Sequence, residues 1–303
     1  MLSLRPRVAL FLVLVASVTL APAAVASGWP ESVSPSGASS GSTSGRSLGQ
    51  SDLTLLGTWT THFIPSNLNG FGTNIKVPAQ RINGTVVPAG GRFDFIMAAG
   101  PFTSPPYKMG GALHNGRIRD NILGGGMCST VTTIFNAAVR AGLTIVERHP
   151  HSLYISRYPV GLDATVWGTP RHGQDMVFIN DTGNPILIKA TAVHRKVTFE
   201  IWGVNDGRTV EFSDPAITNR ISAQLYFEYT DDLAPGVRKS VNDPYDAFEA
   251  AVTRTVRDSQ GDVIHTDPFH SKYKLLNGLT MVGRYPGDPP AGTRVLAQDY
   301  KHH

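Results

Sequence analysis

The chain has a single cysteine, Cys128, and the residues around it are those that would suit a nucleophilic thiol. Gly124, Gly125 and Gly126 lie just before it, and a helical pattern begins at it. Glycines allow a ligand to approach the backbone closely, and the partial positive charge at a helix N-terminus stabilises a thiolate. The alternative interpretation is structural, because free cysteines are often small buried hydrophobic residues.

Two histidines downstream, His149 and His151, could act together with this thiol. Residues two apart on an extended strand point to the same side, so both rings would share one face. In one hypothesis a histidine is the general base that activates Cys128, with an aspartate orienting the ring. In the other, Cys128, His149 and His151 are three ligands of a zinc ion that keeps an open fourth position.

The orienting carboxylate has two candidates. Asp163 is the first choice, because it gives the chain order Cys-His-Asp. A tight hairpin at the intervening Pro-Val-Gly would, however, pair Asp163 with Arg157 and leave it about 20 Å from His151. Asp163 can therefore reach His151 only through a wider loop. Asp175 is the other candidate, whereas Asp181 lies in an Asn-Asp-Thr-Gly sequence that is typical of a turn.

A helix must place the thiol, and the segment from Cys128 to Leu143 predicts one. Gly142 is a natural helix stop. The apolar positions largely follow the i, i+3, i+4, i+7 spacing of a helix with one buried stripe, and they are Val131, Ile134, Phe135, Ala138, Ala141 and Leu143. Residues 86–95 and 177–188 predict short strands that are broken by turn residues.

The predicted fold class is α+β, with a β-rich central domain over residues 52–204 that contains one buried amphipathic helix led by Cys128. Frequent glycine (31) and proline (21) favour turns and strands over a helical bundle. A small all-β domain and tail are expected over 205–303. Its predicted strands cover 221–229, 251–257 and 263–266, with a turn at 258–261, and the domain itself is expected to end near Tyr285.

The N-terminal residues indicate export. Arg5 and Arg7 precede an apolar run over residues 8–20, and an Ala-Val-Ala cleavage sequence ends at Ala26, so residues 1–26 are expected to be a secretory signal. Residues 27–51 are rich in Ser, Gly and Pro and predict a flexible linker. We expect a secreted, extracytoplasmic protein with no membrane span after cleavage.

The charge of the chain says little about its partner. The net charge is +4 and the isoelectric point is near 9.2, yet the basic residues are scattered along the chain. Without a basic run to follow a phosphate backbone, nucleic acid is not an expected partner. A mildly cationic surface suits an anionic bacterial wall, and it is equally consistent with an ordinary solvated surface.

The stretch from Thr61 to Gly203 resembles the VanW family, bacterial envelope proteins named after an accessory gene of vancomycin-resistance clusters. The similarity rests on several blocks in the same order: Asn74-Ile75 with Ile82-Asn83-Gly84, Gly124 to Cys128 with Thr132 to Ala138, Ala141 to Leu143, Glu147 to Ser152, Gly161 to Val166, and Asn180 to Ile188. One departure is central. The family usually has glutamine after the cysteine, where this chain has Ser129. If that glutamine assists as an oxyanion donor, its loss bears on activity.

The resemblance implies a compartment and a process, the cell wall, more than a reaction. The order of cysteine, histidine and aspartate is also that of transglutaminase-like and papain-type thiol enzymes, an analogy at the level of the fold. The tail is similar to the glycine-rich G-five envelope module, which is thought to grip wall glycans, through Pro235-Gly236, Thr253 to Val256, Asp258 to Asp262 and Ser271 to Tyr273.

These observations lead to one main hypothesis. A wall-associated enzyme would use Cys128 as nucleophile, His151 as base, His149 as alternative base and Asp163 as orienting group. The reaction would be acyl transfer or hydrolysis on peptidoglycan or an attached peptide, without a cofactor. The expected substrate-binding residues are Gly124, Gly125, Gly126, Ser129 and Thr132. The alternatives are a module that binds peptidoglycan or another wall glycan without turnover, and the zinc site.

Overall fold

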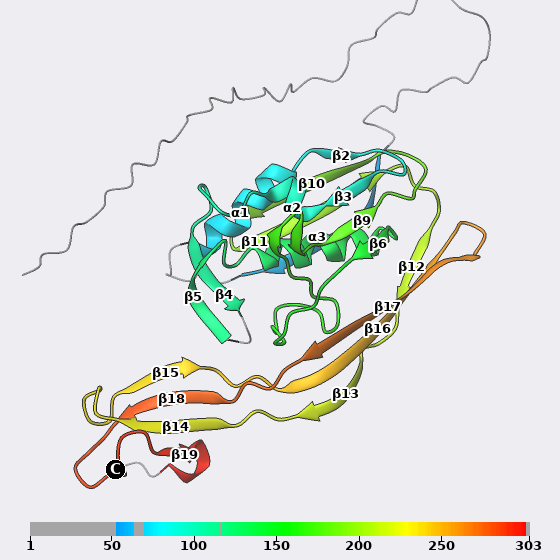
Figure 1. Ribbon diagram of the computed structural model, residues 1–303. Coiled ribbons are helices and arrows are strands. Elements are labelled where there is room, and N and C mark those ends of the chain that lie inside the picture. Colours follow the sequence, from blue (N-terminus) through cyan, green and yellow to red (C-terminus); the bar gives the residue numbers. More distant parts are fainter. Residues whose placement is uncertain (1–52, 64–69, 115–116, 301–303) are drawn as a thin grey trace, which may run out of the picture. The chain divides into compact units, whose positions relative to one another are not determined.

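The computed structural model describes residues 53–63, 70–114 and 117–300 (Figure 1). The expected signal sequence, 1–26, and the expected linker, 27–51, lie outside these residues. Within the described ranges the chain forms many strands and few helices, so the β-rich prediction is confirmed. None of the helices in those ranges combines the length and the apolar character needed to cross a membrane.

The main sheet has four antiparallel strands in the order β1-β11-β10-β2. Alternate residues of β11, Val197, Phe199 and Ile201, are buried, so the sheet has one apolar face. Two helices, α1 and α3, pack against strands of this sheet (Figure 1). The elements are β1 (Thr54–His62), β2 (Thr85–Val87), β10 (Ile186–Val193), β11 (Lys196–Gly203), α1 (Phe71–Ile82) and α3 (Cys128–Arg140).

Helix α3 begins at Cys128, and it is buried on more faces than the expected single stripe. All residues from Ser129 to Val139 are buried, including polar ones. The expectation of one buried stripe is wrong because the polar side chains find partners inside the fold. Asn136, for example, donates to the carbonyl oxygens of Thr132 and Leu162 at 2.9 and 2.7 Å. A polar group that is hydrogen bonded can be buried at a small cost in free energy. The spacing of apolar residues alone therefore predicts fewer buried positions than this helix has.

A three-stranded sheet and two hairpins complete the region before Val204. Residues 86–95 and 177–188 each divide between two sheets, because turns separate β2 from β3 and β9 from β10. The rings of Phe93 and Phe178 stack at 4.8 Å across the smaller sheet. Its elements are β3 (Arg92–Asp94), β9 (Val177–Ile179), β6 (Thr144–Glu147) and the adjoining α2 (Phe95–Ala99); the hairpins are β4 (Met109–His114) with β5 (Arg117–Leu123), and β7 (Trp167–Thr169) with β8 (His172–Gln174).

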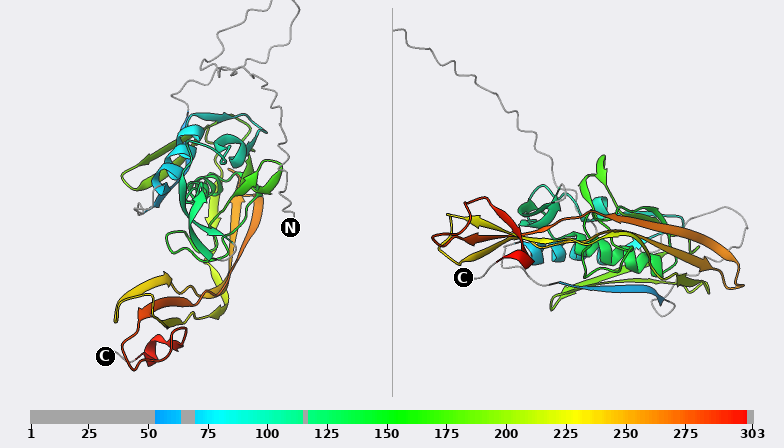
Figure 2. Two further views of the ribbon diagram at one scale, coloured as in Figure 1. Left: turned by 60° about the vertical axis from the view of Figure 1, so that its left-hand side comes forward. Right: turned by 90° about the horizontal axis from the view of Figure 1, so that it is seen from below.

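Beyond Val204 the regular elements of the described chain are strands and one short 3-10 helix. One sheet contains β12 (Thr209–Phe212), β13 (Ala216–Ile221), β16 (Ala247–Arg257) and β17 (Val263–Tyr273). A second contains β14 (Leu225–Thr230), β15 (Arg238–Asn242), β18 (Gly278–Gly283) and β19 (Arg294–Leu296), which a short 3-10 helix (Ala297–Asp299) follows. Figure 2 shows the long β16–β17 hairpin, in yellow to orange, from two further sides.

Two strand expectations for this region differ from the structure. The strand expected over 221–229 is two strands, because β13 ends at Ile221 and β14 begins at Leu225 in a different sheet. The expected end near Tyr285 is too early, because β19 pairs with β14 through Leu296 and Tyr226.

The apolar core extends past the expected boundary at Val204. Val252 on β16 and Phe269 on β17 belong to the same core cluster as helix α3. The rings of Phe135 and Phe269 meet edge to face, with centroids 5.5 Å apart. The β16–β17 hairpin is therefore packed against the helix that Cys128 begins.

Candidate active site around Cys128

Cys128 is held at the start of α3 by a turn that requires glycine. Gly124 and Gly126 have positive φ angles of 79° and 102°, a conformation that costs other residues energy. A Cβ on Gly125 would clash with the carbonyl group of Gly110 on β4. These glycines therefore let the hairpin and the helix approach one another, and Gly124 and Gly125 are themselves buried.

Cys128 as a residue is intermediate in exposure, and its sulfur receives polar contacts from the segment after Asp163. Its Sγ lies 3.1 Å from the hydroxyl oxygen of Thr165. The backbone N–H of Val166 also donates to the sulfur. Donors that point at a sulfur stabilise its thiolate form, so this segment helps to set the reactivity of the thiol.

The ring of His151 is buried, only 4% exposed, and is fixed by a carboxylate. Its Nδ1 lies 2.6 Å from Oδ2 of Asp163. The ring stacks on Tyr158, with centroids 5.4 Å apart. Its Nε2 is buried and has no hydrogen-bond partner among the described residues, and the interaction of the ring with Cys128 shifts the pKa of both groups. The free nitrogen of the ring is thus the one beside the thiol.

Asp163 reaches His151 because the chain between them is a wide loop. A tight hairpin at this turn would have kept Asp163 away from His151. The chain forms no such hairpin here. The only ladder contact here is a bridge between His149 and Thr165, and the intervening loop turns inward to bury Leu153 and Tyr158. A sequence pattern of turn residues does not distinguish a short hairpin from such a loop.

Both oxygens of the Asp163 carboxylate accept hydrogen bonds from more than one donor. Oδ2 accepts from both the ring and the backbone N–H of His151, the latter at 2.7 Å. Oδ1 accepts from Arg148 at 3.1 Å and from the hydroxyl of Tyr273 at 2.6 Å. Burial by itself raises the pKa of this carboxyl, but the interactions with His151, Arg148 and Tyr273 lower it to about 2. Asp163 is therefore an anion at neutral pH.

The thiol and the imidazole shift one another's pKa in opposite directions. Burial raises the pKa of Cys128, but the attraction of the nearby His151 ring, with the donors Thr165 and Val166, lowers it to about 7. Burial lowers the pKa of His151, but Asp163 and Cys128 raise it to about 9. Between these values the pair is a thiolate beside an imidazolium, the reactive form of thiol enzymes.

His149 lies apart from this group. Its Nε2 is 2.9 Å from Oε1 of Glu147, and the side chain is one-third exposed. The expected shared face for the two histidines is wrong, because the chain leaves the extended conformation after the bridge at His149. The zinc hypothesis required Cys128, His149 and His151 together. Among the residues that the structure describes, no group of three or more His, Cys, Asp or Glu side chains is placed to hold a metal ion.

Ser129 and Thr132, the expected substrate contacts, are both fully buried and bond to other parts of the fold. The hydroxyl of Ser129 lies 3.0 Å from that of Tyr158. The hydroxyl of Thr132 donates to the carbonyl oxygen of Ala164 and accepts from its N–H, at 2.8 and 3.0 Å. These hydrogen bonds connect helix α3 to the loop on which Asp163 lies.

The other two aspartates have different partners. Asp175 accepts backbone hydrogen bonds from Ile96 and Met176 at 3.0 and 2.7 Å. Asp181 pairs with Arg208 at 2.8 Å and with His265 at 2.6 Å. Asp175 is thus not the orienting carboxylate of His151, and Asp181 does more than form a turn.

The site lies in a part of the chain that is similar to a known protein family. Residues 72–202 match the family model described as VanW like protein. This segment is similar to VanW proteins. Cys128, His151 and Asp163 all lie within this matched segment, which is less than half of the chain.

A relative of this chain is the Bacillus subtilis (strain 168) protein called "Uncharacterized protein YoaR". The two are 38% identical over 137 residues, which are 45% of this chain and 43% of the relative. The match therefore spans less than half the length of either protein.

Two solved structures are each similar to about a quarter of this chain. "IgA1 Protease G5 domain structure" is 13% identical, covers 27% of this chain and 96% of that one, and has a TM-score of 0.17. "Crystal structure of HP0197-G5" is 17% identical, covers 24% and 99%, and has a TM-score of 0.13. Scores this low carry no functional argument, and the G-five resemblance stays a prediction from the sequence.

The sequence analysis did not predict several residues that the structure places in the site. Thr165, Tyr158 and Arg148 have no distinctive spacing, and Tyr273 lies more than a hundred positions from Asp163 in the chain. Arg148 adjoins His149 in a block that drew notice only for its histidines. A buried hydroxyl or guanidinium becomes visible as a partner only when the folded chain shows what it contacts.

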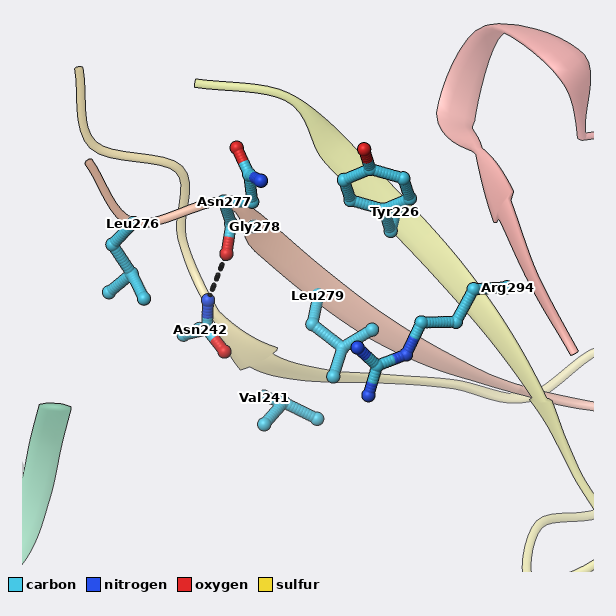
Figure 3. A pocket seen from close by; sticks show the side chains of 8 residues that line it. All are labelled: Tyr226, Val241, Asn242, Leu276, Asn277, Gly278, Leu279 and Arg294. Carbon is cyan, nitrogen blue, oxygen red and sulfur yellow. Dashed lines mark hydrogen bonds between the residues drawn. The ribbon is translucent and has the colours of Figure 1, made fainter. Parts of the chain in front are cut away.

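A hollow lies on the sheet formed by β14, β15 and β18, and its lining residues are distant from Cys128 in the sequence. Its volume is about 660 Å³, and Tyr226, Asn242 and Arg294 contribute to its lining. Figure 3 shows the side chain of Asn242 hydrogen bonded to the carbonyl oxygen of Asn277, at 2.6 Å. Amides, a phenol and a guanidinium are groups that bind polar ligands through hydrogen bonds.

Proposed function

We propose that the chain is an exported, wall-associated thiol enzyme that acts on amide bonds of peptidoglycan or of peptides attached to it. The observation that carries the proposal is the ordered set of Cys128, His151 and Asp163. A thiol, a histidine whose Nε2 has no other partner among the described residues and a carboxylate on its Nδ1 are the parts of a nucleophilic triad. The signal pattern and the VanW resemblance support the wall as the location.

The proposed reaction has two steps. The thiolate of Cys128 attacks the amide carbonyl carbon, and the protonated Nε2 of His151 gives its proton to the leaving amine as the C–N bond breaks. The product is a thioester on Cys128. In the second step His151 takes a proton from water or from an acceptor amine, which attacks the thioester and regenerates the thiol pair.

The developing negative oxygen needs donors in this proposal. The backbone N–H of Cys128 lies at the first position of α3, where helix N–H groups lack intrahelical partners. It is the proposed first donor. The family's glutamine, which could supply a second, is replaced by Ser129, whose hydroxyl is engaged with Tyr158. We therefore expect substantial but reduced oxyanion stabilisation.

Purified protein incubated with peptidoglycan fragments tests the proposal. New fragments should appear by mass spectrometry with the wild type and not with Cys128→Ala, and a thioester should add the mass of the acyl group to the intact chain. His149→Ala is the matched control and should keep activity, because His149 bonds to Glu147. If a thiol alkylator fails to modify Cys128 in the folded protein, the proposal is refuted.

A second candidate function is binding of wall glycan or peptide without turnover. The hollow in Figure 3 and the absence of the family's glutamine support it. Binding to insoluble peptidoglycan should then survive Cys128→Ala and decrease in Asn242→Ala, with no new fragments over time. If the wild type produces fragments and Cys128→Ala does not, this binding function is rejected and the thiol-enzyme function is supported.

A further inference from the structure

The carboxylate of Asp163 is held partly by strand β17, which lies outside the segment that matches the VanW family model. The hydroxyl of Tyr273 donates to Oδ1 of Asp163 at 2.6 Å and accepts from the N–H of Gly161 at 3.2 Å. Ser271 is two residues earlier on the same face of the strand, and its Oγ is 3.5 Å from the same oxygen. Both β17 side chains are buried.

Arg148 ties the same strand to the carboxylate a second time. Its Nη2 donates to Oδ1 of Asp163 at 3.1 Å and to Oγ of Ser271 at 2.8 Å. Its Nη1 donates to the carbonyl oxygen of His270 at 2.8 Å. The side chains of Arg148 and Asp163 are only 5% and 3% exposed, so water does little to screen this ion pair.

These contacts determine which way the carboxylate points. Oδ1 is occupied by donors from Arg148 and β17, which leaves Oδ2 to accept from His151. A carboxylate that lost donors at Oδ1 would be less stable as a buried anion and less firmly aimed. The imidazolium form of His151 would then be weaker support for the thiolate of Cys128.

We propose that strand β17 is a positioning element of the thiol site, acting through the hydroxyl groups of Tyr273 and Ser271 on Asp163. The inference rests on the proposed function and deepens it, because it makes the C-terminal strands part of the reactive centre. Neither residue touches the thiol. Each acts through Asp163 and His151.

The single cysteine provides a direct readout of this role. The thiolate absorbs in the ultraviolet, so its titration can be followed in the full chain without labels. Tyr273→Phe should raise the midpoint of this titration by about 0.5 pH unit or more, because the Asp163 carboxylate is then less firmly aimed at His151 and supports its imidazolium less well. Ser271→Ala should raise it less. Other ionisable or charged groups that influence Asp163, His151 or Cys128 are Arg148, Tyr154 and Tyr158, and they are unchanged in both variants.

Tyr245→Phe is the matched control, because it removes a phenolic hydroxyl that makes no hydrogen bond to Asp163. It should leave the titration midpoint unchanged. Thermal unfolding of each variant establishes that the chain is folded. An unchanged midpoint in folded Tyr273→Phe overturns the inference. Should Tyr273→Phe not fold, Ser271→Ala decides in its place, and an unchanged midpoint there overturns the inference.

This readout separates the inference from the proposed function. A raised midpoint in a protein that produces no peptidoglycan fragments supports the positioning role and refutes the reaction. Fragment production with an unchanged midpoint in folded Tyr273→Phe supports the reaction and refutes the positioning role.

Discussion

The reactivity of Cys128 depends on which protons its neighbours carry. The thiol has a pKa of about 7 and the imidazole of His151 a pKa of about 9. Below the first value Cys128 is protonated and loses nucleophilicity. Above the second, His151 is neutral and has no proton for a leaving amine. The reactive window of the site is therefore set by the two residues as a pair.

Alkylation of Cys128 should follow the first of these values. The rate of reaction with iodoacetamide is expected to rise through about pH 7 and then level off. His151→Ala should move this rise to higher pH, because the attraction that stabilises the thiolate is gone. His149→Ala should leave it in place. A profile that His151→Ala does not change would contradict the assignment of His151 as the partner.

Asp163 should make stability fall in acid. Its pKa is about 2 in the folded chain and about 3.9 when unfolded, so its ionised form adds stability above about pH 4 that is lost as the pH falls toward 2. Asp163→Asn should lower the free energy of unfolding at pH 7 by about 2 kcal/mol or more and by much less near pH 2. Urea unfolding at both pH values measures this. Equal losses at the two values would contradict it.

At the scale of elements, the turn between β5 and α3 decides where the thiol lies. The sequence correctly identified the glycines and the helix start, because both are local signals. It did not identify Ser129 and Thr132 as buried, because their burial depends on the loop that returns with Tyr158 and Ala164. Local patterns predict an element, whereas its partners come from contacts distant in the chain.

Gly125→Ala should destabilise the protein, because the added Cβ would clash with the backbone of Gly110. The expected loss is about 1–3 kcal/mol, the usual cost of overpacking. Gly72→Ala is a matched control within α1, where an added Cβ meets nothing within 4 Å. It should be neutral or stabilise by about 0.5 kcal/mol. Thermal unfolding compares the two, and equal stabilities would contradict the close approach.

At the scale of the whole molecule, a buried arginine joins the β16–β17 hairpin to α3. Arg254 is fully buried and donates to the carbonyl oxygens of Val139 and Leu143 at 3.1 and 2.9 Å. It also pairs with Asp267 at 2.6 Å. The sequence predicted strands in this region, yet nothing in a period-two pattern marks one arginine as an internal link between distant segments.

Arg254→Met should therefore destabilise the described fold as a unit. It leaves two buried carbonyl groups and Asp267 without their donor, at an expected cost of about 3–5 kcal/mol. Arg257→Met removes an exposed hydrogen bond to Gly261 and should cost about 0.5 kcal/mol or less. Calorimetry would show the difference. A similar unfolding temperature for both variants would mean that the buried hydrogen bonds and ion pair of Arg254 contribute little to stability.

The contacts of Asp163 with Tyr273 and of Arg148 with Ser271 also have an evolutionary consequence. Each pair joins a position inside the family-matched segment to one outside it. Substitutions at these positions in one part are therefore expected to constrain substitutions in the other. Among relatives that share both parts, a change at position 273 should be accompanied by changes near 163, and a change at 271 by changes at 148. Relatives that carry the matched segment with a different C-terminal partner must supply these donors from another source.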